Sequence, residues 1–406
     1  MVNIAVLGYG TVGSGVVEVI GRNQEQISGS VGEEVFVKYI LDLRDFPGDI
    51  YEDRVIHDFN VILEDEEVSV VCETMGGVGA AYRFTKEALG AGKSVCTSNK
   101  ELVARHGTEL LALAAEKHCS YMFEASVGGG IPILRTIQTS FTAERIVAIT
   151  GILNGTTNYI LSKMETEHAD YHEVLKQAQE LGYAERNPEA DVEGYDTCRK
   201  TAILAALATG RAVDSEEIYT EGISAVTLAD FEFAARMNRR IKLLACVRVQ
   251  EDGKLLAMVA PFLLPAGHSL AAVGDVFNAV MVTGNMLGDT LFYGRGAGKL
   301  PTASAVVADV VDCARSQGRT AMCGWSEQKA AMGDVAEIKR RFFVRTHAAT
   351  AEAVESAFWG KFDAAVSEGV YCGEEYGFFT PVIKEKDFEK KCGELGNAIS
   401  GKIRLL

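Results

Sequence analysis

The sequence predicts an α/β protein that begins with a parallel, doubly wound sheet and continues into a region of mixed α+β character. Three observations support this fold class. Short apolar runs alternate with helical patterns through the first third of the chain. A glycine-rich turn separates the first apolar run from the first helical pattern, and beyond about residue 145 the apolar runs become longer and less regular. Strands that alternate with helices are typical of parallel sheets covered on both faces.

The predicted elements of the first region are short apolar strands and the amphipathic helices between them. The strands are expected at 2–7, 35–42, 68–73, 93–97 and 120–124. The first helix follows the glycine turn, and further helices are expected near 80–91 and 101–117.

The middle region has longer strands, and the end of the chain has a shorter set of elements. Middle strands are expected at 145–154, 241–250, 255–264 and 277–284, with helices near 156–164, 170–182, 196–209 and 227–238. A helix near 300–316 follows, and 326–340 is a polar stretch that indicates a linker. The last elements are strand 341–346, helix 350–358, strand-like pieces 363–371 and 376–383, helix 386–394 and strand 402–406.

The composition restricts the class of partner. The net charge of −16 argues against nucleic acid and against an anionic membrane surface, because both require clustered Lys and Arg. No apolar run reaches 18 residues and no secretory signal pattern is visible, so a cytoplasmic protein is expected. The cysteines contain no CxxC pair, which predicts free thiols and no zinc site. They are Cys72, Cys96, Cys119, Cys198, Cys246, Cys313, Cys323, Cys372 and Cys392.

The glycine turn is a GxGxxG motif, Gly8-Tyr9-Gly10-Thr11-Val12-Gly13, that follows a strand and opens a helix. In that context it predicts a dinucleotide site. Gly8 permits the tight turn, Gly10 lets the backbone approach a pyrophosphate, and Gly13 lets helix and strand pack closely. The N-terminus of the helix favours the phosphate charge. An ordinary glycine turn is the alternative.

Two charged residues at the end of the second strand bear on the choice of cofactor. Asp42 would hold the adenosine ribose hydroxyls and favour NAD, whereas Arg44 would meet the 2′-phosphate of NADP. Either residue could instead be a solvated loop charge, so the preference stays open. A second glycine cluster at 294–298 opens the helix expected near Thr302, and it either caps the same ligand or forms a flexible turn.

An acidic run at 180–200 leads into an apolar helix. Asp196 and Lys200 are four residues apart and share one helical face. An exposed ion pair is the simple alternative, but the apolar helix places Lys200 at the edge of a buried element, where desolvation would lower its pKa. The preceding loop supplies Glu185, Asp191 and Glu193.

This run suits oxidation of an amino-acid substrate that carries a hydroxyl group. Carboxylates would bind the ammonium group, and a lysine would take the hydroxyl proton while a nicotinamide cofactor takes the hydride. The region contains no histidine; His168 and His172, slightly earlier, indicate an exposed helix rather than a metal site.

Two further loops are rich in glycine or polar residues. Residues 124–132 (EASVGGGIP) could present backbone carbonyls to a hard cation or serve only as a hinge. Residues 154–158 (NGTTN) lie at a strand-to-helix junction and could either cap the helix or line a substrate cleft.

Together these segments resemble homoserine dehydrogenases. The resemblance covers the glycine motif, SNKELVA at 98–104, EASVGGGIPIL at 124–134, GILNGTTNYIL at 151–161, LGYAERNPEADVEGYDTCRK at 181–200 and GRGAGKLPTASAVVADVVD at 294–312. It implies an NAD(P)-dependent interconversion of L-homoserine and L-aspartate 4-semialdehyde. It also implies a homodimer or homotetramer whose interface lies in the middle domain.

The resemblance implies a role for individual residues. Lys200 would give a proton to the aldehyde oxygen and act as the base in the reverse direction, and Asp196 would position Lys200 and the substrate. Glu185, Asp191 and Lys100 would contact the substrate. The cofactor would be held by Gly8, Gly10, Thr11, Val12, Gly13, Asp42, Arg44, Thr74, Ser98, Lys100, Gly296 and Gly298. A monovalent cation, typically sodium, would be bound by Glu124, Val127, Gly129 and Ile131.

The resemblance also implies a division of the chain. Residues 1–130 with the helix 299–318 would bind the dinucleotide, 131–298 would bind substrate and dimerise, and 335–406 would form a small module that resembles an ACT regulatory domain. Two departures stand out. Lys299 replaces a frequent proline, and Ala348-Ala349-Thr350-Ala351 replaces the glycine-containing ligand turn. Feedback inhibition by threonine therefore stays open, with assembly as another role for the module.

Two other functions are compatible with parts of the sequence. A non-catalytic amino-acid sensor with the same fold would be expected to lack Lys200, Asp196 or the glycine motif, yet all are present. A dehydrogenase that oxidises an aldehyde through an acyl-enzyme would need a cysteine–histidine pair, and Cys198 has no histidine nearby in sequence. The predicted function is therefore that of a homoserine dehydrogenase.

Overall fold

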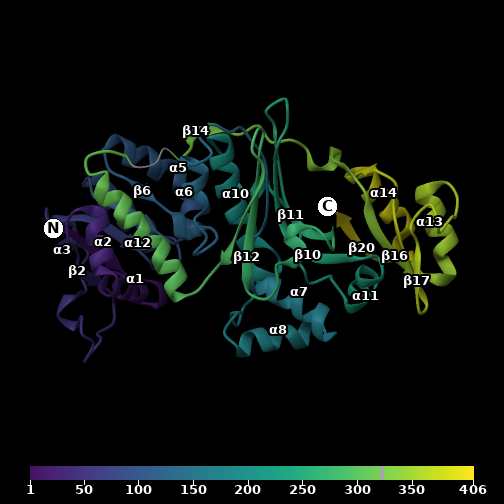
Figure 1. Ribbon diagram of the computed structural model, residues 1–406, viewed down its shortest axis with the longest axis horizontal. Coiled ribbons are helices and arrows are strands. Elements are labelled where there is room, and N and C mark those ends of the chain that lie inside the picture. The colour runs from purple at the N-terminus through teal and green to yellow at the C-terminus, as the bar shows by residue number, and fades with distance from the viewer. Residues whose placement is uncertain (321–323) are drawn as a thin grey trace. The chain divides into compact units, whose positions relative to one another are not determined.

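The computed structural model describes residues 1–320 and 324–406 (Figure 1). The chain forms two compact units. The first comprises Met1–Val147, Ala202–Ser215 and Val282–Ala330, and the second comprises Ala148–Thr201, Glu216–Met281 and Ala331–Leu406. Among the described residues, no helix is both long and apolar enough to cross a membrane.

The first unit is built on a six-stranded parallel sheet with the order β3-β2-β1-β4-β5-β6. These strands are β3 (Val55–Ile56), β2 (Val35–Leu41), β1 (Val2–Leu7), β4 (Val68–Glu73), β5 (Ser94–Thr97) and β6 (Tyr121–Met122). β1 is buried along its whole length, as expected of a central strand with helices on both faces. This strand order and the glycine turn after β1 define a dinucleotide-binding fold of the Rossmann type.

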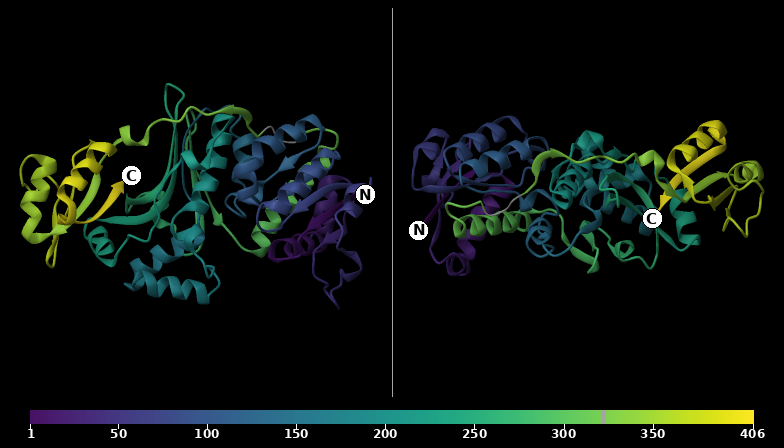
Figure 2. Two further views of the ribbon diagram at one scale, coloured as in Figure 1. Left: turned by 180° about the vertical axis from the view of Figure 1, so that it is seen from behind. Right: turned by 90° about the horizontal axis from the view of Figure 1, so that it is seen from above.

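The helices of the first unit cover both faces of the sheet (Figure 2). α1 (Thr11–Arg22) packs beside α12 (Lys299–Arg315) on one face, and α4 (Gly79–Gly90) packs beside α5 (Lys100–Glu116) on the other. The core beneath α1 and α12 is made of small aliphatic side chains such as Val16 and Val306. The return of α12 therefore completes a fold that the first third of the chain begins.

Several local predictions for the first unit were wrong. The strand expected at 120–124 covers only Tyr121–Met122, and Glu124–Ser126 forms a 3-10 helix. α2 (Gln24–Val31), α3 (Asn60–Glu64) and the two-residue β3 were not expected. α2 buries only Ile27, so it carries no apolar periodicity to find.

A second, mixed sheet of ten strands has the order β13-β12-β7-β10-β11-β20-β16-β18-β17, with β9 also paired to β11. Its strands are β7 (Ile146–Ile152), β9 (Tyr219–Thr220), β10 (Arg239–Val249), β11 (Leu255–Pro265), β12 (Phe277–Gly284), β13 (Gly288–Arg295), β16 (Phe342–His347), β17 (Val370–Cys372), β18 (Glu375–Phe379) and β20 (Ile399–Leu405). β13 was not predicted, because it is a half-exposed edge strand without a buried apolar run.

The helices of the second unit include those that carry the acidic run. They are α7 (Gly155–Glu167), α8 (Tyr171–Glu180), α9 (Glu189–Val192), the start of α10 (Tyr195–Thr209) and α11 (Leu228–Arg236). His168 and His172 are exposed as expected, but not on one helix: His168 ends α7 with a left-handed backbone, and His172 lies in α8.

The C-terminal elements follow the predicted order of strand, helix, strand, strand, helix and strand. α13 (Ala351–Trp359) lies between β16 and β17 in the chain, and α14 (Glu385–Leu395) lies between β18 and β20. β20 pairs in parallel with β11 through Arg404 and Leu405, so this small sheet continues the middle sheet. The strand expected at 363–371 is wrong except for its end, and the linker expected at 326–340 contains the short strands β14 (Ser326–Lys329) and β15 (Lys339–Arg340). The three-part division of the chain remains a prediction.

Candidate active site

The glycine motif forms a tight turn over the end of β1. Gly8 has a φ of +90°, a left-handed conformation that favours glycine. A Cβ atom added to Gly13 would lie 1.8 Å from the carbonyl oxygen of Gly8, whereas one added to Gly10 would meet no atom within 4 Å. Thr11 and Val12 begin α1 directly after the turn. The motif therefore needs glycine at position 13 for packing, and at position 10 it leaves open space for a ligand.

A cavity of about 620 Å³ lies beside this turn, at the carboxyl ends of the strands. The hydroxyl of Thr74 donates to the carbonyl oxygens of Leu7 and Gly8 at 2.9 Å, which ties the end of β4 to the turn. Ser98 follows β5, and its amide donates to the Glu73 carbonyl at 3.4 Å. The cavity is lined by Gly8, Gly10, Leu41, Asp42, Leu43, Arg44, His57, Phe59, Thr74, Met75, Gly76, Ala80, Arg83 and Phe84.

Asp42 and Arg44 form an ion pair at the edge of this cavity. Arg44 donates to the carboxylate of Asp42 through Nε at 2.9 Å and Nη2 at 3.0 Å. The Tyr9 amide donates to the same carboxylate at 2.8 Å. These bonds, the one from the Arg44 side chain first, hold the pKa of Asp42 far below its usual range. His57 and Arg83, which were not predicted, also line the cavity.

The two glycine-rich loops of the first unit pack against each other. A Cβ atom on Gly129 would lie 2.4 Å from the carbonyl oxygen of Gly296, and the Gly130 amide donates to the Arg295 carbonyl at 3.1 Å. Gly298, with a φ of +125°, caps α12. The 294–298 segment is therefore a packed turn rather than a loose one. Lys100 begins α5, which is capped by the side chain of Asn99.

The side chain of Glu124 accepts hydrogen bonds from the protein backbone. It is buried, and its two oxygens accept hydrogen bonds from the amides of Leu134 (2.9 Å) and Arg135 (2.6 Å). Burial raises its pKa. Ile131 carries its carbonyl on the same loop and accepts from the Ile133 amide, while Val127 and Gly129 lie between them. The carboxylate of Glu124 is therefore tied to the two backbone amides at 134–135.

Lys200 and Asp196 form a buried pair on α10. Their side chains join at 2.6 Å, and the two residues are only 8% and 3% exposed. The Lys200 ammonium also donates to the Leu153 carbonyl at 2.8 Å. The alternative of an exposed ion pair is therefore wrong. Burial makes the pair sensitive to any change in its partners, since an uncompensated buried charge is costly.

Asn154 connects this pair to the acidic loop. Its side-chain amide donates to Asp191 at 2.7 Å and to Asp196 at 2.9 Å. Its oxygen accepts from the Thr157 amide at 2.8 Å and caps α7. The helix cap expected for 154–158 is therefore confirmed, and the lining of a substrate cleft stays a prediction. Glu185 is exposed in the loop after α8, and Glu193 is half-buried just before α10.

Eight of the nine cysteines have free thiols in the structure, and Cys323 lies outside the described residues. Cys198 is buried on α10.

The Rossmann-type unit with a glycine turn and an open cavity at the strand ends places the chain among the dinucleotide-binding proteins. Comparison with known proteins is more specific. Residues 132–311 match the protein-family model described as "Homoserine dehydrogenase", and residues 8–124 match "Homoserine dehydrogenase, NAD binding domain". The chain belongs to the homoserine dehydrogenase family.

Similar proteins agree with this assignment. A homoserine dehydrogenase of Bacillus subtilis is 45% identical over 318 residues, which are 76% of this chain and 72% of that protein. One of Mycobacterium tuberculosis is 40% identical over 373 residues, 89% of this chain and 83% of that protein. A solved homoserine dehydrogenase from Thiobacillus denitrificans has a TM-score of 0.89 at 34% identity and covers 100% of this chain and 98% of its own.

Homoserine dehydrogenases are NAD(P)-dependent oxidoreductases that act on the hydroxyl group of homoserine, as predicted from the sequence motifs. The same comparisons favour the enzyme over the non-catalytic sensor.

Proposed function

We propose that Lys200 transfers the proton in the interconversion of L-homoserine and L-aspartate 4-semialdehyde, with Asp196 as its positioning partner. The observation that carries this proposal is the buried cluster of Lys200, Asp196, Asn154 and Asp191. When bound, the oxidised nicotinamide supplies an acceptor for the hydride that leaves the carbon bearing the hydroxyl group. The bonds to Leu153 and Asp196 orient the lysine amine. The carboxylate of Asp196 stabilises the ammonium form that gives its proton to the aldehyde oxygen.

The acidic loop and the start of α5 supply the other proposed substrate contacts. Asp191, held by Asn154, and the exposed Glu185 would bind the substrate ammonium group. Lys100 would contact the substrate beside the nicotinamide. The remaining cofactor contacts are proposed for Gly8 to Gly13, Thr74, Ser98, Gly296 and Gly298, as the family resemblance implies.

For the cofactor, we propose that NADP is preferred over NAD. Arg44 would leave Asp42 to meet the 2′-phosphate, and the guanidinium of Arg83 and the imidazole of His57 line the same cavity. A hyperthermophilic archaeal homoserine dehydrogenase with a TM-score of 0.66 and 29% identity, covering 77% of this chain and 97% of its own, was solved in complex with NADPH. The ratio of kcat/KM for NADPH and NADH, before and after Arg44→Ala, tests this; an unchanged ratio removes Arg44 from the proposal.

Three further proposals rest on the family resemblance. A sodium ion would be held by carbonyls of the Glu124–Ile131 loop, where Gly128 and Gly129 have left-handed backbones; activity in sodium against a large organic cation tests it. The chain would form a homodimer or homotetramer, for which β13 offers the exposed side chains Leu291 and Tyr293, and light scattering measures its mass. The free thiols support a cytoplasmic location.

The role of Lys200 is tested by Lys200→Ala. We expect kcat to fall by about a hundredfold or more while the affinity for NADPH stays normal, because the general acid is lost and the cofactor site is not touched. Lys242→Met is a matched control, since Lys242 is another buried lysine of the second unit and bonds to the Val273 carbonyl. If Lys200→Ala kept turnover close to that of the control, the assignment would be wrong.

A further inference from the structure

The last strand of the chain makes buried polar contacts with a loop that lies nearly 200 positions earlier in the sequence. Arg404 on β20 is only 4% exposed. Its guanidinium donates to Glu221 at 2.5 Å, to the Tyr219 hydroxyl at 2.9 Å and to Glu385 at 2.5 Å. Bonds in three directions hold the planar guanidinium rigidly, which a lysine could not reproduce. The C-terminal strand therefore holds the 219–221 segment firmly.

The residues that follow Glu221 brace the acidic loop. The Ile223 amide donates to the Val192 carbonyl at 2.8 Å. Gly222 packs so closely that a Cβ atom there would lie 2.2 Å from the same carbonyl oxygen and 2.5 Å from the Cα atom of Glu193. The two nearest of these atoms belong to the backbone, which cannot move aside as a flexible side chain can. A shift of the 221–223 segment would therefore move Val192.

Val192 is the residue after Asp191 and ends the short helix α9. Asp191 is in turn bonded to Asn154, which also holds Asp196. A continuous series of contacts thus runs from Arg404 through Glu221, Gly222 and Val192 to Asp191. All of these residues belong to the second unit.

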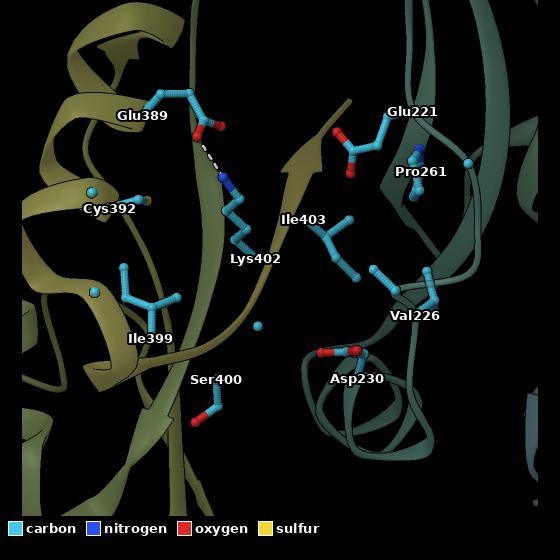
Figure 3. A pocket seen from close by; sticks show the side chains of 15 residues that line it. Glu221, Val226, Asp230, Pro261, Glu389, Cys392, Ile399, Ser400, Lys402 and Ile403 are labelled. Carbon is cyan, nitrogen blue, oxygen red and sulfur yellow. Dashed lines mark hydrogen bonds and ion pairs between the residues drawn. The ribbon is translucent and has the colours of Figure 1, made fainter. Parts of the chain in front are cut away.

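A cavity of about 480 Å³ borders the same segment (Figure 3). Glu221 and Val226 line it on one side, and Lys402 and Ile403 of the C-terminal strand line it on the other. On this side the segment borders open space, while its backbone is held by pairing with β11 and by the contacts of Gly222 with Val192 and Glu193. The ion pair with Arg404 is a direct side-chain connection across the boundary between β20 and the segment.

We infer that Arg404 and Glu221 are positioning residues for Asp191, whose carboxylate contacts the substrate. The C-terminal strand thereby takes part in homoserine binding. The inference rests on the proposed function, in which Asp191 contacts the substrate. In this view the C-terminal module supports substrate binding without having to bind a regulatory ligand of its own. Loss of the Arg404 contacts would let the acidic loop relax and would weaken substrate binding, while the dinucleotide site of the other unit would be unaffected.

The test compares Arg404→Met with Arg345→Met. Arg345 on β16 is also buried, at 6% exposure, and it bonds to Asp230 of α11 and to Glu375, not to the 219–223 segment. We expect Arg404→Met to raise the KM for homoserine by about tenfold and to leave the KM for NADP within about twofold. Arg345→Met should lower the thermal midpoint comparably and leave both KM values nearly unchanged. Equal KM changes in the two variants would overturn the inference.

Two more variants keep the outcome clear. Gly222→Ala displaces Val192 directly and should raise the KM for homoserine even if Arg404→Met does not fold; an unchanged KM contradicts the inference. Asp191→Asn separates the two proposals. If it leaves the KM unchanged, the proposed role of Asp191 fails. If it raises the KM while Arg404→Met and Gly222→Ala do not, only the positioning role fails.

Discussion

Asn154 performs two separable tasks, and a pair of substitutions distinguishes them. Its side-chain oxygen caps α7 through the Thr157 amide, and its side-chain NH₂ group donates to Asp191 and Asp196. Asn154→Ser keeps an oxygen for the cap but replaces the NH₂ group, which donates to both carboxylates, by the single O–H of a side chain too short to bridge them. Asn154→Ala removes the cap as well. Because serine caps helices about as well as asparagine, the difference between the two variants isolates the cap.

The expected magnitudes follow from these contacts. A hydrogen bond to a charged group contributes about 1.5–3 kcal/mol, so the loss of two coupled ones should lower the free energy of unfolding of Asn154→Ser by about 2–4 kcal/mol. Loss of the cap should lower that of Asn154→Ala by about 1 kcal/mol more. If half of the first loss is expressed in the transition state, kcat/KM for homoserine falls by about five- to thirtyfold in both variants.

Urea unfolding gives the stabilities, and initial rates at 340 nm with varied homoserine give kcat/KM. Equal activity losses with a stability difference of one cap would support both tasks. The reasoning would be refuted if Asn154→Ser kept the kcat/KM of the unaltered protein, because the two carboxylates would then not depend on their amide partner. Equal stabilities of the serine and alanine variants would remove the cap from the account.

Three other outcomes are expected. Burial raises the pKa of Glu73 to about 7, so its stabilising contribution is present below its unfolded pKa near 4.5 and is lost as the pH rises through 7. Relative to Glu73→Gln, the free energy of unfolding should therefore fall by about 2 kcal/mol between pH 5 and 7.5. A difference between the two proteins that stays constant with pH in urea titrations would contradict this. Burial lowers the pKa of Lys242 to about 8, so its contribution to the free energy of unfolding is lost as the pH falls through 8. Relative to Lys242→Met, the free energy of unfolding should rise by about 2 kcal/mol between pH 7 and 9.5. A fall over this pH range in the same titrations would contradict the prediction. Gly13→Ala should raise the KM for NADP by about tenfold or more, because the added Cβ atom displaces Gly8. Gly29→Ala is the control and should leave this KM unchanged, because a Cβ atom there meets no atom within 4 Å. A normal KM for Gly13→Ala would count against the glycine turn as the phosphate site.

Local patterns were enough to predict the architecture of the first unit and the family. The alternation of β1, α1, β2 and β4 is visible because buried parallel strands and amphipathic helices have different periods in sequence. The glycine motif is likewise a local signal, since the turn, the close approach and the helix packing all depend on residues within one segment. The short α2 and the edge strand β13 were missed because neither buries an apolar run.

The sequence by itself was enough to predict which residues carry the chemistry, namely the glycine turn and the run from Glu185 to Lys200. Only the tertiary structure decided how they are held. An aspartate and a lysine four residues apart look the same whether the helix face is exposed or buried, and burial depends on what packs over it. The bonds from Asn154 to the acidic loop and from Arg404 to Glu221 join residues far apart in the chain. No periodicity records such contacts, because they arise only when separate elements pack together.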